Sequence, residues 1–291
     1  MRQALRRGMT VGGTIVGGFA LAVAVAAITA NVRWGRVTTR KVRLLAPPDS
    51  DGAAAGAGRY STAELAGLPA PVRRYFIYAL TPGQRLVRSA RVEQEGEFAQ
   101  RAGTWDRFTA TEHFAVRPPG FVWDATIRMM PLLGVRVRDS YVDGVGTVDA
   151  RVAGAMPAAH LHGTREVAEA ALQRYLAEAV WLPTALLPSA GVGWTGIDDA
   201  SARATITDQG LAVSVTFHFG ADGEIVGTSA ERYRDVSGAP EPTPWVGRFW
   251  DYERIHRMMV PRRGEVAWVL GGERVPYWRG AVRDVAYQPA P

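Results

Sequence analysis

The sequence predicts an α+β fold: an N-terminal transmembrane helix, then a large, curved, mostly antiparallel β-sheet (a partial barrel) with one long helix packed across its concave face. Three observations lead to this prediction. An uncharged apolar segment lies near the N-terminus, one later segment has a clear helical period, and the chain on both sides of that segment alternates with a period of two.

The apolar segment covers residues 10–32, which include no charged side chain and are long enough to cross a hydrocarbon core of ~30 Å at ~1.5 Å per residue. Basic residues flank it on both sides. We therefore expect a basic tail at residues 1–9 and a transmembrane anchor at residues 10–32. A cleaved signal peptide, with small-residue sites at residues 22–26, is the alternative.

The distribution of charge points to a membrane and not to nucleic acid. Residues 1–60 carry nine Lys or Arg and two Asp, whereas residues 61–291 carry 25 Arg and 26 Asp or Glu. The positive excess therefore flanks the apolar segment, and the rest of the chain is nearly neutral. We expect a single-pass protein of the cell membrane. Basic residues on both sides leave its orientation open, and we expect the extracytoplasmic side, with the cytoplasmic side as the alternative.

After the anchor we expect a basic juxtamembrane segment and flexible linker at residues 33–58, because residues 46–58 read APPDSDGAAAGAG. A single curved-sheet domain should occupy residues 59–291. It opens with a capping box at Ser61 and Glu64 and a short helix over residues 71–80 that begins with proline.

The sheet is predicted from strict alternation. Residues 121–129 place Phe121, Trp123 and Ala125 on one face and Asp124 on the other, and residues 211–219 repeat the pattern. Short turns such as Asp143-Gly144 recur about every ten residues, which is typical of hairpins.

The central helix is predicted at residues 164–182. Apolar residues share one face, Thr164 is an N-cap candidate and Pro183 ends the periodic run. The helix should pack on the sheet, and a lid over an apolar cavity is the alternative.

The absence of cysteine and of several known motifs excludes some kinds of chemistry. Without cysteine the chain has no disulfide, thiolate nucleophile or cysteine-ligated metal, and it lacks nucleotide-binding and hydrolase fingerprints. His160 and His162 could chelate zinc with His113 or Glu112, but we expect surface histidines, no metal and no cofactor.

Strand aromatics and embedded charges are the ligand-binding candidates, with plain core packing and cross-strand ion pairs as the alternative. Arg128, Arg138 and Arg248 are expected to meet an acidic head group. The full set of candidates is Trp123, Arg128, Arg138, Tyr141, Glu178, Trp181, Arg248, Trp250, Trp268 and Trp278.

The strings GFVWDATIRM, VRDSYVDG, LQRYLAEAVWLPTALLP, GEVAW and PYWRG, in this order, resemble a bacterial family of membrane-anchored proteins of unknown function over residues 65–290. The resemblance supplies no catalytic residues. In architecture alone, the predicted domain is similar to the periplasmic lipoprotein-carrier half-barrels.

From these features we expect a membrane-tethered, non-enzymatic module that binds an apolar or lipid-like ligand at the cell envelope. One alternative is an acid–base enzyme that uses Asp124, Asp139, Glu178 or Glu265 beside arginines. The other alternative is an envelope scaffold protein.

Overall fold

The computed structural model describes residues 25, 28–45, 58–101, 103–130, 133–152 and 156–290. Within them, thirteen strands form one sheet in the order β6-β5-β4-β3-β2-β1-β13-β12-β11-β10-β9-β8-β7. Neighbours in this order are also neighbours along the chain, except for β1 and β13, which join the two halves. The two edge strands, β6 and β7, are therefore the ones that flank the central helix in the sequence.

All the strand pairs are antiparallel, and several neighbouring strands are joined by two-residue turns in which both residues have positive φ. At one of them, Asp143 and Gly144 have φ values of 52° and 76°, as a two-residue hairpin turn requires. The strands are β1 (Val87–Arg101), β2 (Thr104–Ala115), β3 (Gly120–Met130), β4 (Leu133–Val142), β5 (Val145–Val152), β6 (Met156–His162), β7 (Gly193–Gly196), β8 (Ser201–Asp208), β9 (Leu211–Phe219), β10 (Ile225–Val236), β11 (Ala239–Ile255), β12 (Met258–Leu270) and β13 (Glu273–Pro289).

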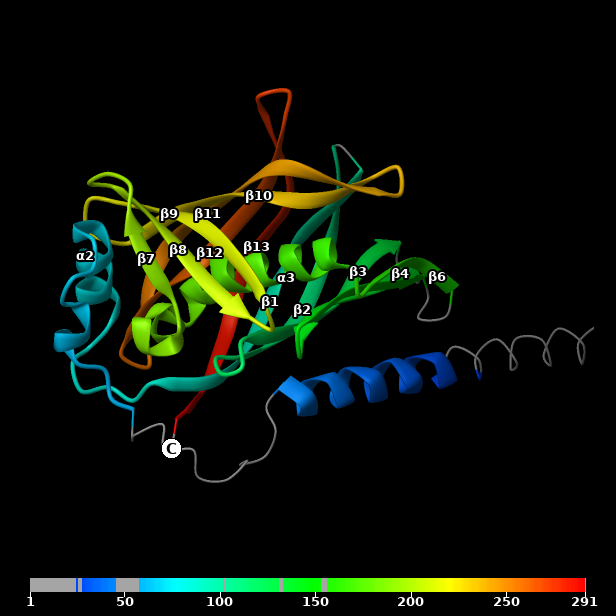
Figure 1. Cartoon of the computed structure of the whole chain (residues 1–291). Helices are drawn as coiled ribbons and strands as arrows, with labels where there is room; N and C mark the ends of the chain where they lie inside the picture. The colour runs from blue at the N-terminus through cyan, green and yellow to red at the C-terminus, as the bar shows by residue number, and fades with distance from the viewer. Residues whose placement is uncertain are drawn as a thin grey trace, which may run out of the picture.

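Helix α3 (Arg165–Glu178) lies in the hollow between the two halves of the sheet (Figure 1). The Thr164 hydroxyl caps it by accepting a hydrogen bond from the Val167 amide. Three short 3₁₀ turns follow: η2 (Ala179–Trp181), η3 (Pro183–Leu186) and η4 (Pro188–Ala190). The turn η1 (Thr62–Leu65) and helix α2 (Ala70–Ala79) pack at the end of the sheet near β7, β8 and β12.

An N-terminal helix, residues 28–45, lies across the other face of β3, β4 and β5 (Figure 1). Trp34 is 3% exposed there, and its indole Nε1 donates to both carboxylate oxygens of Asp124 at 3.0 and 2.9 Å. Leu45 packs with Ala115, Val122 and Val142 in a second, smaller apolar cluster. The protein thus has three layers: the N-terminal helix, the sheet and α3.

The predicted fold class is wrong as stated. Among the described residues, no helix combines the length and the apolar content that crossing a bilayer requires. Most of the predicted anchor at residues 10–32 lies outside the described residues, as do the tail at residues 1–9 and residues 46–57 of the linker. The last residues of the predicted anchor, 28–32, belong to the N-terminal helix that packs on the sheet. The same helix also carries Arg33, Arg36, Arg40, Lys41 and Arg43.

The predicted central helix is also too long. The α-helix ends at Glu178, and the chain continues as 3₁₀ turns because Pro183 has no amide hydrogen and Leu182, before it, takes φ −129° and ψ 66°.

Candidate ligand site

The hollow under α3 is closed by apolar side chains. Leu172, Tyr175 and Leu176 of α3 and Trp181 of η2 are at most 1% exposed. Phe114 and Phe121 contribute rings from the sheet, and Phe114 lies 6.4 Å from Tyr175 between ring centroids. The middle of the inner face is therefore a packed core, and space for a ligand must lie elsewhere.

A buried ionic cluster joins α3 to the sheet. The Arg174 guanidinium donates to Asp139 at 2.7 Å, to Glu178 at 2.9 Å and to Glu112 at 3.2 Å. The same guanidinium lies 4.9 Å from the ring of Phe121 and 5.1 Å from that of Trp123. One cation thus holds three carboxyl groups from a helix and two strands.

Glu112 is the unusual member of this ionic cluster because it is fully buried. Burial, and then the charge of Glu178, raise the pKa of Glu112 well above its ordinary value. Gln94 orients it, donating to Glu112 at 2.8 Å and accepting from the Trp123 indole at 2.9 Å. A protonated Glu112 can donate to Glu178, whose Oε2 has no other partner among the described residues.

A groove of about 400 Å³ opens at the N-terminal end of α3, between β6 and the hairpin of β10 and β11. Asp139 of the ionic cluster reaches its edge. The apolar side chains that line it are Val148, Leu161, Val167, Ala170, Ala171 and Pro240.

Two arginines form the β10 wall of this groove. Arg232 is 8% exposed, donates to the Ala170 carbonyl at 2.7 Å and lies 4.7 Å from the ring of Trp245. Arg234 lies 6.0 Å from the ring of Trp268. Neither arginine forms an ion pair with a described carboxylate, and the Nε of each is buried without a hydrogen-bond partner. The groove is thus mostly apolar, with two arginines on one side that form no ion pair with a described carboxylate, although Asp139, Glu166 and Asp235 also line it.

The ten residues predicted to bind a ligand occupy different environments. Trp123, Tyr141 and Trp181 are in the inner core, with the half-buried Trp278 against Phe108 and Trp181. Glu178 is in the ionic cluster, and Trp268 lies beneath Arg234, close to the groove. Arg138 is buried under the N-terminal helix, and Arg128, Arg248 and Trp250 are exposed on the outer face. A ligand role for these ten residues stays a prediction.

Of the four carboxylates considered for acid–base chemistry, two meet. Asp139 and Glu178 share Arg174, whereas Asp124 and Glu265 are on the outer face. His160 and His162 stack at 5.9 Å, and His160 is 2.6 Å from Asp149. The described residues include no group of three His, Asp or Glu side chains placed to hold a metal ion.

Sequence reasoning missed Arg232, Arg234 and Arg174. The first two are two residues apart in a strand, and this spacing puts both on one face. Arg174 precedes Glu178 by one helical turn, a spacing that predicts the pair but not its burial.

The comparison with curated proteins found no match. Among solved structures, the LolA superfamily protein NE2245 of Nitrosomonas europaea is 11% identical, with a TM-score of 0.32, and the match covers 76% of this chain and 93% of that chain. A β-barrel-like protein of the domain of unknown function DUF1849 from Brucella abortus is 7% identical, with a TM-score of 0.27 and coverage of 70% and 99%. Both similarities are too weak to transfer a ligand. Residues 66–287 match the Family of unknown function (DUF6920), so the chain belongs to this family, as its sequence strings predicted.

Proposed function

We propose that the protein binds an amphiphilic molecule, an apolar chain that carries one anionic group, in the groove between α3, β6 and β10. One observation carries the proposal: Arg232 is almost fully buried at the wall of a mostly apolar groove and forms no ion pair with a described carboxylate. A buried cation is costly unless it is paired, so an anion from a ligand is its natural complement.

The aromatic rings under the arginines support this reading. Trp245 is fixed by a 2.9 Å hydrogen bond from its indole to the Tyr277 hydroxyl, and Trp268 stacks on Tyr277 at 5.7 Å. Cation–π contacts hold the guanidinium groups of Arg232 and Arg234 in place without neutralising them. A carboxylate or phosphate at this wall would gain charge-assisted hydrogen bonds at little ordering cost.

The remaining lining suits an alkyl chain. Val148, Leu161 and Val167 face the same space, and each buried methylene contributes about 0.8 kcal/mol. Molecules of this type are membrane components or products, and a location at the cell envelope is part of the proposal.

The test is binding of a dansyl-labelled fatty acid to the full chain, followed by fluorescence. Arg234→Gln removes one groove cation and should weaken binding about tenfold, the loss of one charge-assisted hydrogen bond. Arg248→Gln is the matched control, because it makes the same change on the exposed outer face of the neighbouring strand β11. Absence of probe binding, or equal weakening by both variants, would refute the proposal.

A further inference from the structure

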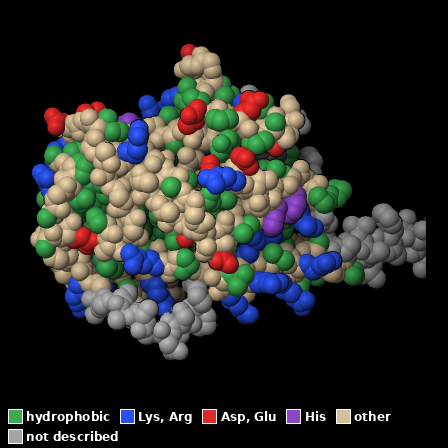
Figure 2. Space-filling model, viewed as in Figure 1, with side chains coloured by type: hydrophobic (Ala, Val, Ile, Leu, Met, Phe, Trp, Pro, Cys, Tyr) green, Lys and Arg blue, Asp and Glu red, His purple; other side chains and the backbone are tan. Residues whose placement is uncertain are grey.

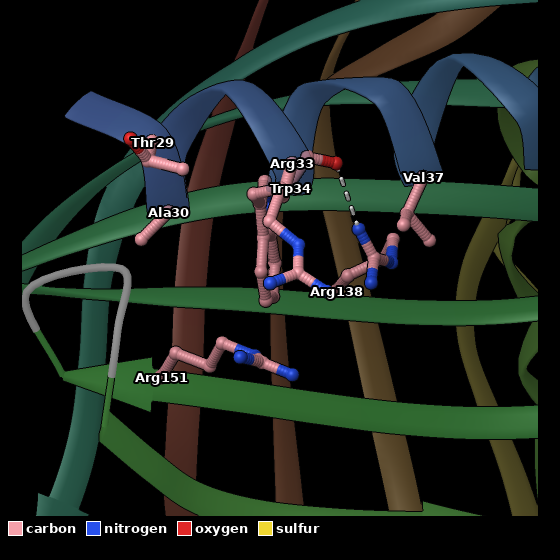
Figure 3. Close-up of a pocket in the computed structure, with 7 residues that line it drawn as sticks. All are labelled: Thr29, Ala30, Arg33, Trp34, Val37, Arg138 and Arg151. Atoms are coloured by element: carbon pink, nitrogen blue, oxygen red, sulfur yellow. Dashed lines mark hydrogen bonds between the residues drawn. The ribbon is translucent and has the colours of Figure 1, made fainter. Parts of the chain in front are cut away.

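A second cavity, of about 510 Å³, lies on the opposite face of the sheet, under the N-terminal helix (Figure 3). Thr29, Ala30, Trp34 and Val37 of the helix form one side. Arginines from different elements extend into the same region: Arg33 from the helix, Arg138 from β4 and Arg151 from β5.

Arg138 is rigidly held at the wall of this cavity. It is 4% exposed and lies 4.1 Å from the ring of Trp34. It donates to the Trp34 carbonyl at 3.3 Å, to the Thr38 hydroxyl at 3.0 Å and to Asp149 at 3.2 Å. Its terminal nitrogens are therefore occupied, and the carboxylate of Asp149 partly offsets its charge.

Arg33 and Arg151 are different because both are exposed. Neither forms a hydrogen bond or an ion pair with a described residue. Asp149, two residues before Arg151 on β5, is already shared between Arg138 and His160. Two guanidinium groups thus line the cavity without a hydrogen-bond partner among the described residues.

Lys41 adds a further positive charge on the same interface. Its ammonium donates to Ser140 at 3.1 Å and to Thr147 at 2.9 Å. Burial, and then the charge of Arg138, lower the pKa of Lys41, while Asp149 and Asp139 act in the opposite direction.

From this arrangement we infer that the cavity binds a phosphate or phosphoester group between Arg33 and Arg151. Two planar guanidinium forks match the oxygens of a phosphate. The apolar walls of Ala30, Trp34 and Val37 leave the rest of the cavity for a less polar part of the same molecule.

The group could belong to free phosphate or to a lipid head group. The outward side of the helix carries Arg36, Arg40 and Arg43 beside the exposed Ile28 and Val32, and residues 28–45 include no acidic side chain. Figure 2 shows basic side chains gathered along this helix. A lipid head group would suit both the basic and the apolar side chains on this outward side of the helix.

The experiment is calorimetric titration of the full chain with inorganic phosphate and, separately, with dihexanoyl phosphatidic acid below its micelle concentration. Arg33→Gln and Arg151→Gln should each weaken binding of either probe about tenfold or more. Arg43→Gln is the control: it makes the same change on the same helix, outside the cavity, and should alter affinity less than about twofold.

Tighter binding of the phosphatidic acid identifies a lipid head group, and equal binding identifies free phosphate; both support the site. The inference is overturned if neither probe binds, or if Arg43→Gln weakens binding as much as Arg33→Gln and Arg151→Gln, which would mean diffuse attraction. This site and the α3 groove are on opposite faces, so either can fail alone.

Discussion

Arg174 shows at the residue scale how this protein tolerates buried charge. Its guanidinium is packed between Phe121 and Trp123 and donates to three carboxyl groups that have little other access to solvent. Such a cluster adds little net stability compared with apolar packing, but removing Arg174, the one cation among its described members, leaves the carboxyl groups without that partner.

Arg174→Met should therefore lower the free energy of unfolding by about 3–5 kcal/mol. Chemical denaturation measures the loss. Arg165→Met is the control, because Arg165 is exposed and pairs only with Glu169, so its loss should stay near 0.3–0.5 kcal/mol, as an order of magnitude. Similar losses for the two variants would show that the ionic cluster is not essential.

Glu112 predicts a pH dependence. The folded protein holds the Glu112 proton at pH values at which the unfolded chain has released it, because burial and Glu178 raise the pKa of Glu112 above 4.5. Its contribution to stability is therefore present at low pH and falls as the pH rises above about 4.5, by at most about 1.4 kcal/mol per pH unit.

Glu112→Gln removes this loss because the amide does not ionise. The stability of the variant relative to the wild type should rise between pH 5 and pH 8, measured by denaturation at both values. Glu231→Gln, at an exposed position, should show a constant difference. A constant difference for Glu112→Gln as well would contradict the assignment.

The inward orientation of Glu112 could be predicted from sequence, because two-residue spacing puts it on the same face of β2 as Phe108, Ala110 and Phe114. Its partner was not. Arg174 is 62 residues away, and only the path of α3 across the sheet brings the two together.

At the scale of elements, the N-terminal helix is where sequence and structure differ most. Its sheet-facing positions are Trp34, Thr38, Lys41 and Leu45, at helical spacing but of mixed polarity. Three of them bond to polar side chains of the outer face, including Asp124 and Ser140. Hydrophobic periodicity cannot reveal such a polar interface, so the contact of this basic segment with the sheet was not predicted.

Trp34→Ala should release this helix from the sheet, since removal of a buried tryptophan costs about 3–5 kcal/mol. Lys41, the only lysine in the chain, reports the change: its reaction with an amine-specific reagent should become faster than in the wild type. Val37→Ala, at a side chain that is 42% exposed, should leave the labelling rate unchanged. Equal rates for Trp34→Ala and wild type would show that the helix is held by other contacts.

At the scale of the whole molecule, the strand pair that joins the two halves of the sheet could not be predicted from sequence. Alternation and turns predict hairpins between strands that are neighbours in the sequence. The pair of β1 and β13 is different, because Val87 pairs with Pro289, a residue far away in the sequence. The sequence predicted a helix across the concave face, but not the groove that remains at one end of α3. The aromatic strand residues indicated burial, and the structure assigns most of them to the core.

The central claim, that this groove holds an amphiphile, is tested most directly by closing it. Ala170→Trp places a large side chain in the groove from the partly exposed face of α3, while Ala212→Trp makes the same change at an exposed position of β9. Dodecanoate binding to the full chain is then measured by calorimetry, with dodecyltrimethylammonium as the cationic counterpart. The account predicts that dodecanoate binds more tightly than the cation, that Ala170→Trp abolishes its binding and that Ala212→Trp preserves it. Equal affinity for the two detergents, or undiminished binding to Ala170→Trp, would contradict it.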